Sequence, residues 1–170
     1  MSRFPNLAAL ALIVGLTGGS AVAEPLGLGR EATKDEVAAW DIDVRPDGLG
    51  LPEGSGSVMD GEEIYMAVGR WPVLAGGYDT LKSARPVKTI GSYWPYLSTV
   101  WDYVHRAMPF GDAQSLSNDD TYALTAYLLY LNDIVDDEFE LTKENFTEVV
   151  MPNAAGFYAD DRTETAVWKN

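Results

Sequence analysis

The stretch "SLSNDDTYALTAYLLYLND", residues Ser115–Asp133, carries the strongest fold signal in the chain. Ser117 is a good N-cap residue, and Asp120 three positions later completes the S-x-x-D pattern of a capped helix start. Apolar residues then recur from Tyr122 to Leu131, and Asn132 suits the end of a helix. The stretch therefore predicts one well-defined α-helix with enough apolar surface to organise a core.

Residues 91–110, "GSYWPYLSTVWDYVHRAMPF", predict a second helix. Pro95 suits a first helical turn, and Pro109 ends the helical pattern. The apolar positions between the two prolines recur at the spacing of one helix face: Leu97, Val100, Trp101 and Val104.

Two shorter helices are expected nearer the N-terminus. Asp60 can cap a helix that starts at Gly61, and the Trp-Pro dipeptide that follows limits this helix to about two turns. Within 33–40, Thr33 and Glu36 have the spacing of a capping box. Helices this short must be held by packing rather than by their own propensity.

The remaining segments predict loops rather than strands. Residues 44–57, "VRPDGLGLPEGSGS", are rich in Gly, Pro and Ser and predict an extended loop that either wraps a surface or reaches a partner. Residues 141–153 indicate a last short turn or helix from Thr142. No run alternates with a period of two for long enough to indicate a sheet. The chain is therefore predicted to be all-α, a small helical domain with long loops.

Residues 1–23 have the pattern of a secretory signal peptide. Arg3 supplies a positive start, Leu7–Leu16 is an apolar run, and Ala21 and Ala23 make a small-x-small cleavage site. The run is too short to cross a hydrocarbon layer, which needs roughly 20 residues. We therefore expect an exported, periplasmic protein without membrane insertion, although an uncleaved anchor is the alternative.

The chain has the length of a single domain. The expected order is a signal peptide over 1–23, an extended N-terminal arm over 24–56, a helical domain over 57–157 and a polar tail over 158–170. The formal net charge is −14, and removal of Arg3 with the signal makes it −15. Nucleic acid and anionic lipid would be repelled by such a surface, so a protein partner with a basic patch fits better.

The counts of cysteine and histidine exclude several kinds of chemistry. The chain has no cysteine, which rules out disulfides, thiol catalysis and thioether attachment of a haem. Its one histidine, His105, is too few for an ordinary zinc site. Hydrolysis through His105 is disfavoured because no Gly-x-Ser-x-Gly elbow accompanies it.

Several segments, taken in order, resemble class I cytochrome c. They are "GEEIY" (61–65), "GRWPVLAGG" (69–77), "YVHRAMPF" (103–110) and the helix of 117–132. More narrowly, "GSYWPY" (91–96), "RAMPF" (106–110) and "VVMPNAAGF" (149–157) are similar to the cytochrome subunit or domain of periplasmic sulfur (sulfane) dehydrogenase and of sulfite dehydrogenases. The resemblance covers residues 51–157. It implies a cytochrome c-like fold, a place in electron transfer during sulfur oxidation, and a molybdenum-containing dehydrogenase subunit as partner.

The resemblance also implies that a functional segment is missing. In the resembled family the first helix runs into a Cys-x-x-Cys-His segment that binds the haem covalently and ligates its iron. Here Ala67 is followed directly by Val68 to Pro72, with no remnant of that segment. No covalent haem is therefore expected, the haem site is degenerate, and a non-covalently held haem remains an alternative.

Five residues match family positions around the haem. Met108 matches the distal axial ligand and is the one candidate metal ligand; without haem it would fill the core. Pro72 and Leu74 match a loop that lines the pocket, or they form a turn and a core anchor. Tyr93 and Trp94 match residues at the haem edge, whose polar tips can bind propionates, or they are buried aromatics.

His105 is not expected to be the second iron ligand. His105 and Met108 are three residues apart on one helix and so share a face, whereas axial ligands approach from opposite sides. His105 is expected at the surface, paired loosely with Asp102 or with the C-terminal end of the helix dipole. In the resembled family the first and last helices cross through a small residue and an aromatic, which places Gly61 and Tyr65 against Tyr127.

Three functions follow from these features. In the first, the chain is a haem-free, partner-binding subunit of a molybdenum-containing sulfur-oxidising dehydrogenase, and the N-terminal arm and acidic surface do the binding. In the second, it still carries electrons through a haem held by Met108 and another ligand. In the third, it is a decayed copy that works poorly. No residue is expected to be catalytic, because in the resembled complexes the molybdenum subunit performs the oxidation.

Overall fold

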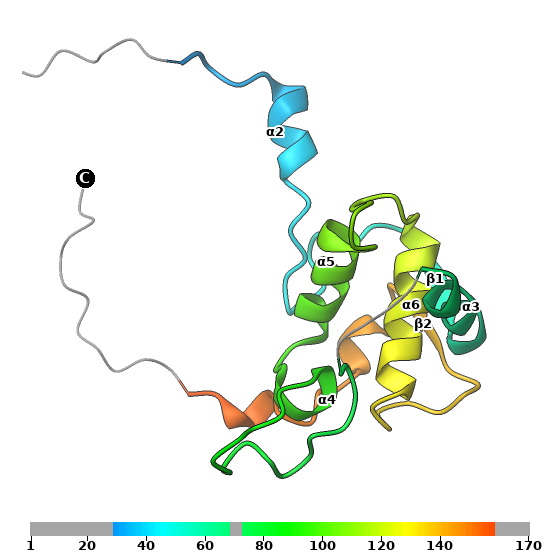
Figure 1. Ribbon diagram of the computed structural model, residues 1–170. Helices are drawn as coiled ribbons and strands as arrows, with labels where there is room; N and C mark the ends of the chain where they lie inside the picture. The colour runs from blue at the N-terminus through cyan, green and yellow to red at the C-terminus, as the bar shows by residue number, and fades with distance from the viewer. Residues whose placement is uncertain (1–28, 69–72, 159–170) are drawn as a thin grey trace, which may run out of the picture. The chain divides into compact units, whose positions relative to one another are not determined.

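The computed structural model describes residues 29–68 and 73–158 (Figure 1). The chain divides into two compact units, Met1–Ala39 and Trp40–Asn170, and each is described by itself. The predicted signal peptide, Pro72 and nearly all of the predicted polar tail lie outside the described residues. Among the residues that are described, no helix has the length and apolar content needed to cross a membrane.

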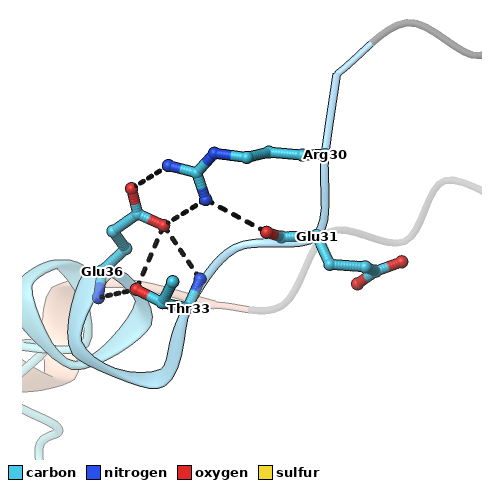
Figure 2. Close-up of polar contacts among 4 residues, drawn as sticks. All are labelled: Arg30, Glu31, Thr33 and Glu36. Atoms are coloured by element: carbon cyan, nitrogen blue, oxygen red, sulfur yellow. Dashed lines mark hydrogen bonds and ion pairs between the residues drawn. The ribbon is translucent and has the colours of Figure 1, made fainter.

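Helix α2, Lys34–Trp40, follows the predicted capping box. The Glu36 N–H donates to the Thr33 hydroxyl (3.3 Å), and the Thr33 N–H donates to the Glu36 carboxylate (2.8 Å). Figure 2 shows that the Arg30 guanidinium also binds the Glu36 carboxylate, and the distance from Arg30 Nη1 to Glu36 Oε2 is 2.8 Å. The Arg30 contact, followed by the Thr33 N–H, lowers the pKa of Glu36 to about 2. This network orders the helix start without burying any residue of α2.

Helix α6, Asn118–Tyr130, is the centre of the second unit (Figure 1). It begins where the sequence predicted, because the Ser117 hydroxyl accepts the Asp120 N–H (3.1 Å) and the Asp120 carboxylate accepts the Ser117 N–H (3.1 Å). Every residue from Thr121 to Leu129 is buried. A helix buried on all sides must be covered by several elements, and here the covering elements are α3, α5, α4 and both strands.

Helix α3, Val58–Val68, begins three residues earlier than predicted. The prediction that Asp60 caps the helix is wrong, because the Ser57 hydroxyl accepts the Asp60 N–H (3.1 Å) and so caps the first turn. The predicted crossing with α6 is confirmed. The rings of Tyr65 and Tyr127 lie 5.2 Å apart, and a Cβ added to Gly61 would lie only 2.0 Å from the Ala123 carbonyl oxygen.

One small sheet was not predicted. Strand β1, Ser55–Ser57, pairs antiparallel with β2, Glu140–Thr142, and Gly56 lies opposite Leu141. Three residues are too few to display a period of two, so the pattern gave no signal. The helical architecture of the all-α prediction therefore holds, with a two-stranded ladder added to it.

Helix α5, Leu97–Ala107, lies within its predicted segment, but its N-cap is Tyr96 rather than a residue before Pro95. A short helix that was not predicted, α4 at Ile90–Tyr93, precedes it and is capped by Thr89, whose hydroxyl accepts the Ser92 N–H (3.1 Å). The segment after β2 forms two 3₁₀ turns, η1 at Phe146–Glu148 and η2 at Ala154–Gly156.

The glycine-rich loop of residues 44–57 wraps the second unit. Leu51 is buried in the core, and the Tyr122 hydroxyl donates to the Pro52 carbonyl (2.9 Å). Just before this loop, Arg106 of α5 forms an ion pair with Asp43 (2.9 Å). Of the two alternatives for this loop, wrapping a surface is the one that the contacts support.

Candidate functional site

An apolar cavity of about 70 Å³ lies between α5 and α6 and is also bordered by Leu74, by Tyr65 of α3 and by Ile90 of α4. Its wall is made by three of the five predicted site residues, Leu74, Trp94 and Met108, together with seven others. Those others are Tyr65, Ile90, Val100, Tyr103, Val104, Leu124 and Leu128. The wall has no polar surface, so the cavity favours apolar contents or none.

Met108 reaches this cavity from the end of α5. It is the C-cap residue, with extended backbone, and its N–H donates to the Val104 carbonyl (3.0 Å). The cap bond fixes the backbone from which the side chain reaches the cavity wall, where it is half-buried. Met108 is the one sulfur on the wall, in a position that agrees with a ligand or a core-filling role alike.

The side chains of Trp94 and Tyr93 contact different parts of the molecule, although the two residues are neighbours in the sequence. Trp94 lines the cavity and meets the Tyr103 ring edge-on, with centroids 5.7 Å apart. Tyr93 is not on the cavity wall, and its ring packs against Phe157 at 5.5 Å. Both aromatics are half-buried rather than buried. The structure therefore brings Trp94, and not Tyr93, into the predicted site.

A buried asparagine ties the cavity wall to the end of α6. Asn132 is 1% exposed, and its amide nitrogen donates to the carbonyls of Leu74 (3.1 Å) and Leu128 (2.8 Å). Its amide oxygen accepts the Gly91 N–H (3.1 Å), and the Tyr78 hydroxyl donates to its backbone carbonyl. Asn132 thus positions the Leu74 loop and α4 together, which is more than the helix end that the sequence predicted.

His105 lies away from the cavity wall, so it and Met108 do not share a site. His105 is half-buried rather than fully at the surface, and it lies in the last turn of α5, where the sequence led us to expect either Asp102 or the helix dipole to act on it. Its ring stacks on Trp101, with centroids 4.8 Å apart, while Asp102 binds Arg106 at 2.7 Å. Partial burial lowers the pKa of His105; Asp102 opposes this shift and Arg106 adds to it.

The described walls do not fit a haem. Ligand pockets in proteins usually measure roughly 300–1,000 Å³, and a cavity of about 150 Å³ is enough for benzene. The cavity here is about 70 Å³ and offers one soft donor, Met108, with His105 facing elsewhere. In ranges 29–68 and 73–158, no group of three His, Asp or Glu side chains could hold a metal ion either.

Sequence reasoning missed most of the cavity wall. Val100 and Val104 were recognised as one apolar face of α5, but that pattern does not say that the face borders a hollow. Leu124 and Leu128 had the same i, i+4 spacing on α6 and could have been added. Ile90 carried no signal, because α4 itself was not predicted.

The comparisons with known proteins gave one informative result. No protein-family profile and no curated protein sequence matches the chain. The chain is similar to a chain in the crystal structure of the sulfane dehydrogenase SoxCD from Paracoccus pantotrophus, with 59% identity and a TM-score of 0.72. The match covers 84% of this chain and 76% of that one. This chain belongs to the family of that SoxCD subunit.

Membership in the SoxCD subunit family confirms the link to a sulfur dehydrogenase family that the sequence suggested. The match covers so much of the chain that it cannot rest on one helix or one motif alone.

Proposed function

We propose that this chain is a cytochrome c-like accessory subunit of a periplasmic sulfur-oxidising dehydrogenase, and that it binds its partner without a covalently held haem. The observation that carries the proposal is the combination of chain-long similarity to the SoxCD subunit with a cavity that offers a single donor. The proposed partner is the molybdenum-containing subunit, which performs the oxidation. The chain itself contributes no catalytic residue.

Helix α2 supports a partner-binding role. Within it, the side chains of Val37 and Trp40 are 53% and 80% exposed, and they share a face because they are three residues apart. A seven-residue helix is marginal in water, and its cap contributes only about 1 kcal/mol. An ordered short helix with an exposed tryptophan is suited to docking, because Trp is among the side chains that dominate binding energy at interfaces.

The test is binding of the purified chain to the molybdenum subunit, measured by titration calorimetry. Trp40→Ala should weaken binding by at least about tenfold, the effect expected for a buried aromatic anchor. Phe110→Ala is the matched control, because Phe110 is an exposed aromatic (94%) outside α2 and should leave binding unchanged. Equal losses in both variants, or no binding by the parent chain, would sink the proposal.

The electron-carrier alternative rests on Met108, the thioether on the cavity wall. It is tested by the visible spectrum and a pyridine haemochrome assay of chain purified from a periplasm competent in haem maturation. We expect a folded protein without stoichiometric haem. A Soret band at one haem per chain that is lost in Met108→Ala would replace partner binding by electron transfer as the function.

A further inference from the structure

Three of the twelve basic residues of this acidic chain lie close together in a segment that has no acidic residue. Residues 80–101 contain Lys82, Arg85 and Lys88 but no Asp or Glu, although the formal net charge of the chain is −14. In the part of the chain that the structure describes, other basic residues form ion pairs: Arg30, Arg45, Arg106 and Lys143. Within the same part, no carboxylate lies at ion-pair distance from the three basic residues of this segment or from Lys34.

The loop that carries the three cations is ordered by its own hydrogen bonds. The Thr80 hydroxyl donates to the Gly77 carbonyl (2.6 Å) and accepts the Val87 N–H (3.0 Å), which closes the loop at its base. The Ser92 hydroxyl donates to the Val87 carbonyl (2.8 Å) and ties the loop to α4. Because the backbone is already fixed, a ligand that binds this loop pays little for ordering it.

A groove of about 310 Å³ runs beside the loop. Its lining includes Lys82 and a single acid, Asp79, and it continues to Asn153 at the opposite edge. Next to it, the Lys88 ammonium lies 4.6 Å from the centroid of the Tyr93 ring, so its charge is held close to the surface rather than extended into solvent. The volume is within the range of sites that accept a ligand segment.

We propose that residues 80–88 and this groove form a docking surface for an acidic polypeptide segment of a partner protein. Attraction between exposed charges is screened beyond about 8 to 10 Å, so a short acidic segment laid on the loop gains mainly from the three nearby cations, opposed by the one carboxylate that lines the groove, Asp79. A second copy of the chain brings its own net charge of −14 and is repelled. Membranes and nucleic acids extend over the acidic surface and are repelled as well.

The experiment measures binding of a fluorescent oligoglutamate peptide to the full chain by anisotropy, with an oligoglutamine peptide as the neutral control. Four single variants are compared: Lys82→Glu, Arg85→Glu, Lys88→Glu and Lys34→Glu. All four change the net charge equally, and none removes an ion pair. Each loop variant should weaken binding by about two- to fivefold, since an exposed charge contact is worth up to about 1 kcal/mol. Lys34→Glu should leave binding unchanged.

Three outcomes would overturn the proposal. Equal weakening by all four variants would mean that the peptide senses only net charge. Failure of the parent chain to bind the peptide at low ionic strength would mean that the loop is not a site. Tighter binding of a single-stranded oligonucleotide, or self-association abolished by the loop variants in sedimentation velocity, would assign the loop to another occupant. The inference does not depend on the proposed function, because none of these measurements involves haem or a molybdenum subunit.

Discussion

The two sides of helix α6 are built on opposite principles. On the side that faces α3 and β1, backbones approach so closely that a Cβ at Gly61 would lie 2.0 Å from the Ala123 carbonyl oxygen, and one at Gly56 would lie 2.1 Å from the Ala123 nitrogen. On the side that faces α5, side chains leave a cavity of about 70 Å³ lined by Leu124 and Leu128. One side is filled by backbone contact, and the other is incompletely filled by side chains.

The difference separates contacts that the chain makes by itself from a space that its side chains leave unfilled. The glycine crossing involves only the chain itself, so it does not need a cofactor. The cavity costs about 2 kcal/mol at roughly 24 cal/mol per Å³, which is small beside a typical domain stability of about 5 to 15 kcal/mol. A small hollow beside α5 is therefore compatible with a folded domain, whereas a methyl group at the crossing should cost more than the hollow does.

The largest expected effect tests the close side. Gly61→Ala should lower the free energy of unfolding by about 3 kcal/mol, because the backbone atoms that it meets cannot move aside. Without the clash, the same change within a helix would stabilise by up to about 1 kcal/mol, so even the sign is informative. Urea denaturation followed by circular dichroism measures it. A variant as stable as the parent would contradict the close crossing.

The second largest effect tests the hydrogen bonds of Asn132 after the end of α6. Asn132→Asp should destabilise by about 2 kcal/mol, because a carboxylate can still accept the Gly91 N–H but cannot donate to the carbonyls of Leu74 and Leu128. Asn118→Asp is the matched control, since Asn118 is only half-buried and makes one long bond, to the Glu53 carbonyl (3.3 Å). Equal thermal stability of the two variants would show that Asn132 is not a structural link.

A third, smaller effect tests the cavity between α5 and α6. Val104→Ile adds one methylene to a residue on the cavity wall and should stabilise by about 0.5 to 1 kcal/mol. Val58→Ile makes the same change at a buried residue that is not on that wall, and it should destabilise through overpacking. Opposite signs in thermal denaturation would support the comparison. Two losses of similar size would mean that the cavity does not exist in solution.

The smallest effect concerns pH. The pKa of His105 is lowered in the folded chain by burial, so below about 6.5 the unfolded chain takes up a proton that the folded chain resists. The stability contribution is therefore present above pH 6.5 or so and is lost as the pH falls toward the folded pKa. His105→Phe keeps the ring on Trp101 and should flatten this part of the stability profile. An unchanged slope would place the titration on other groups.

Much of the secondary structure followed from local chemistry. The capping pairs Ser117 with Asp120 and Thr33 with Glu36 were predicted from spacing alone and are formed. Caps are readable because donor and acceptor are three residues apart, so no tertiary information is needed. The start of α3 was misplaced for a related reason. Ser57 and Asp60 are both good caps, and only the geometry of the chain selects between them.

The site was less predictable. The resemblance placed Leu74, Trp94 and Met108 together, and the structure does bring them to one wall. It also placed Tyr93 there, but backbone direction turns that ring toward Phe157 instead. Tyr93 is the last residue of α4 and Trp94 is its C-cap, so the two rings leave the backbone in different directions, and sequence spacing does not reveal which of them reaches the site.

The sequence by itself determined where the main helices lie, how two of them are capped, the acidic balance of the chain and the lack of any cysteine. These are properties of composition or of residues a few positions apart. Only the tertiary structure decided that α6 is close-packed against α3 and borders a cavity beside α5. It also decided that Asn132 holds the Leu74 loop and α4 together and that His105 stacks on Trp101. Those features depend on contacts between distant segments, and no local pattern encodes the volume left between them.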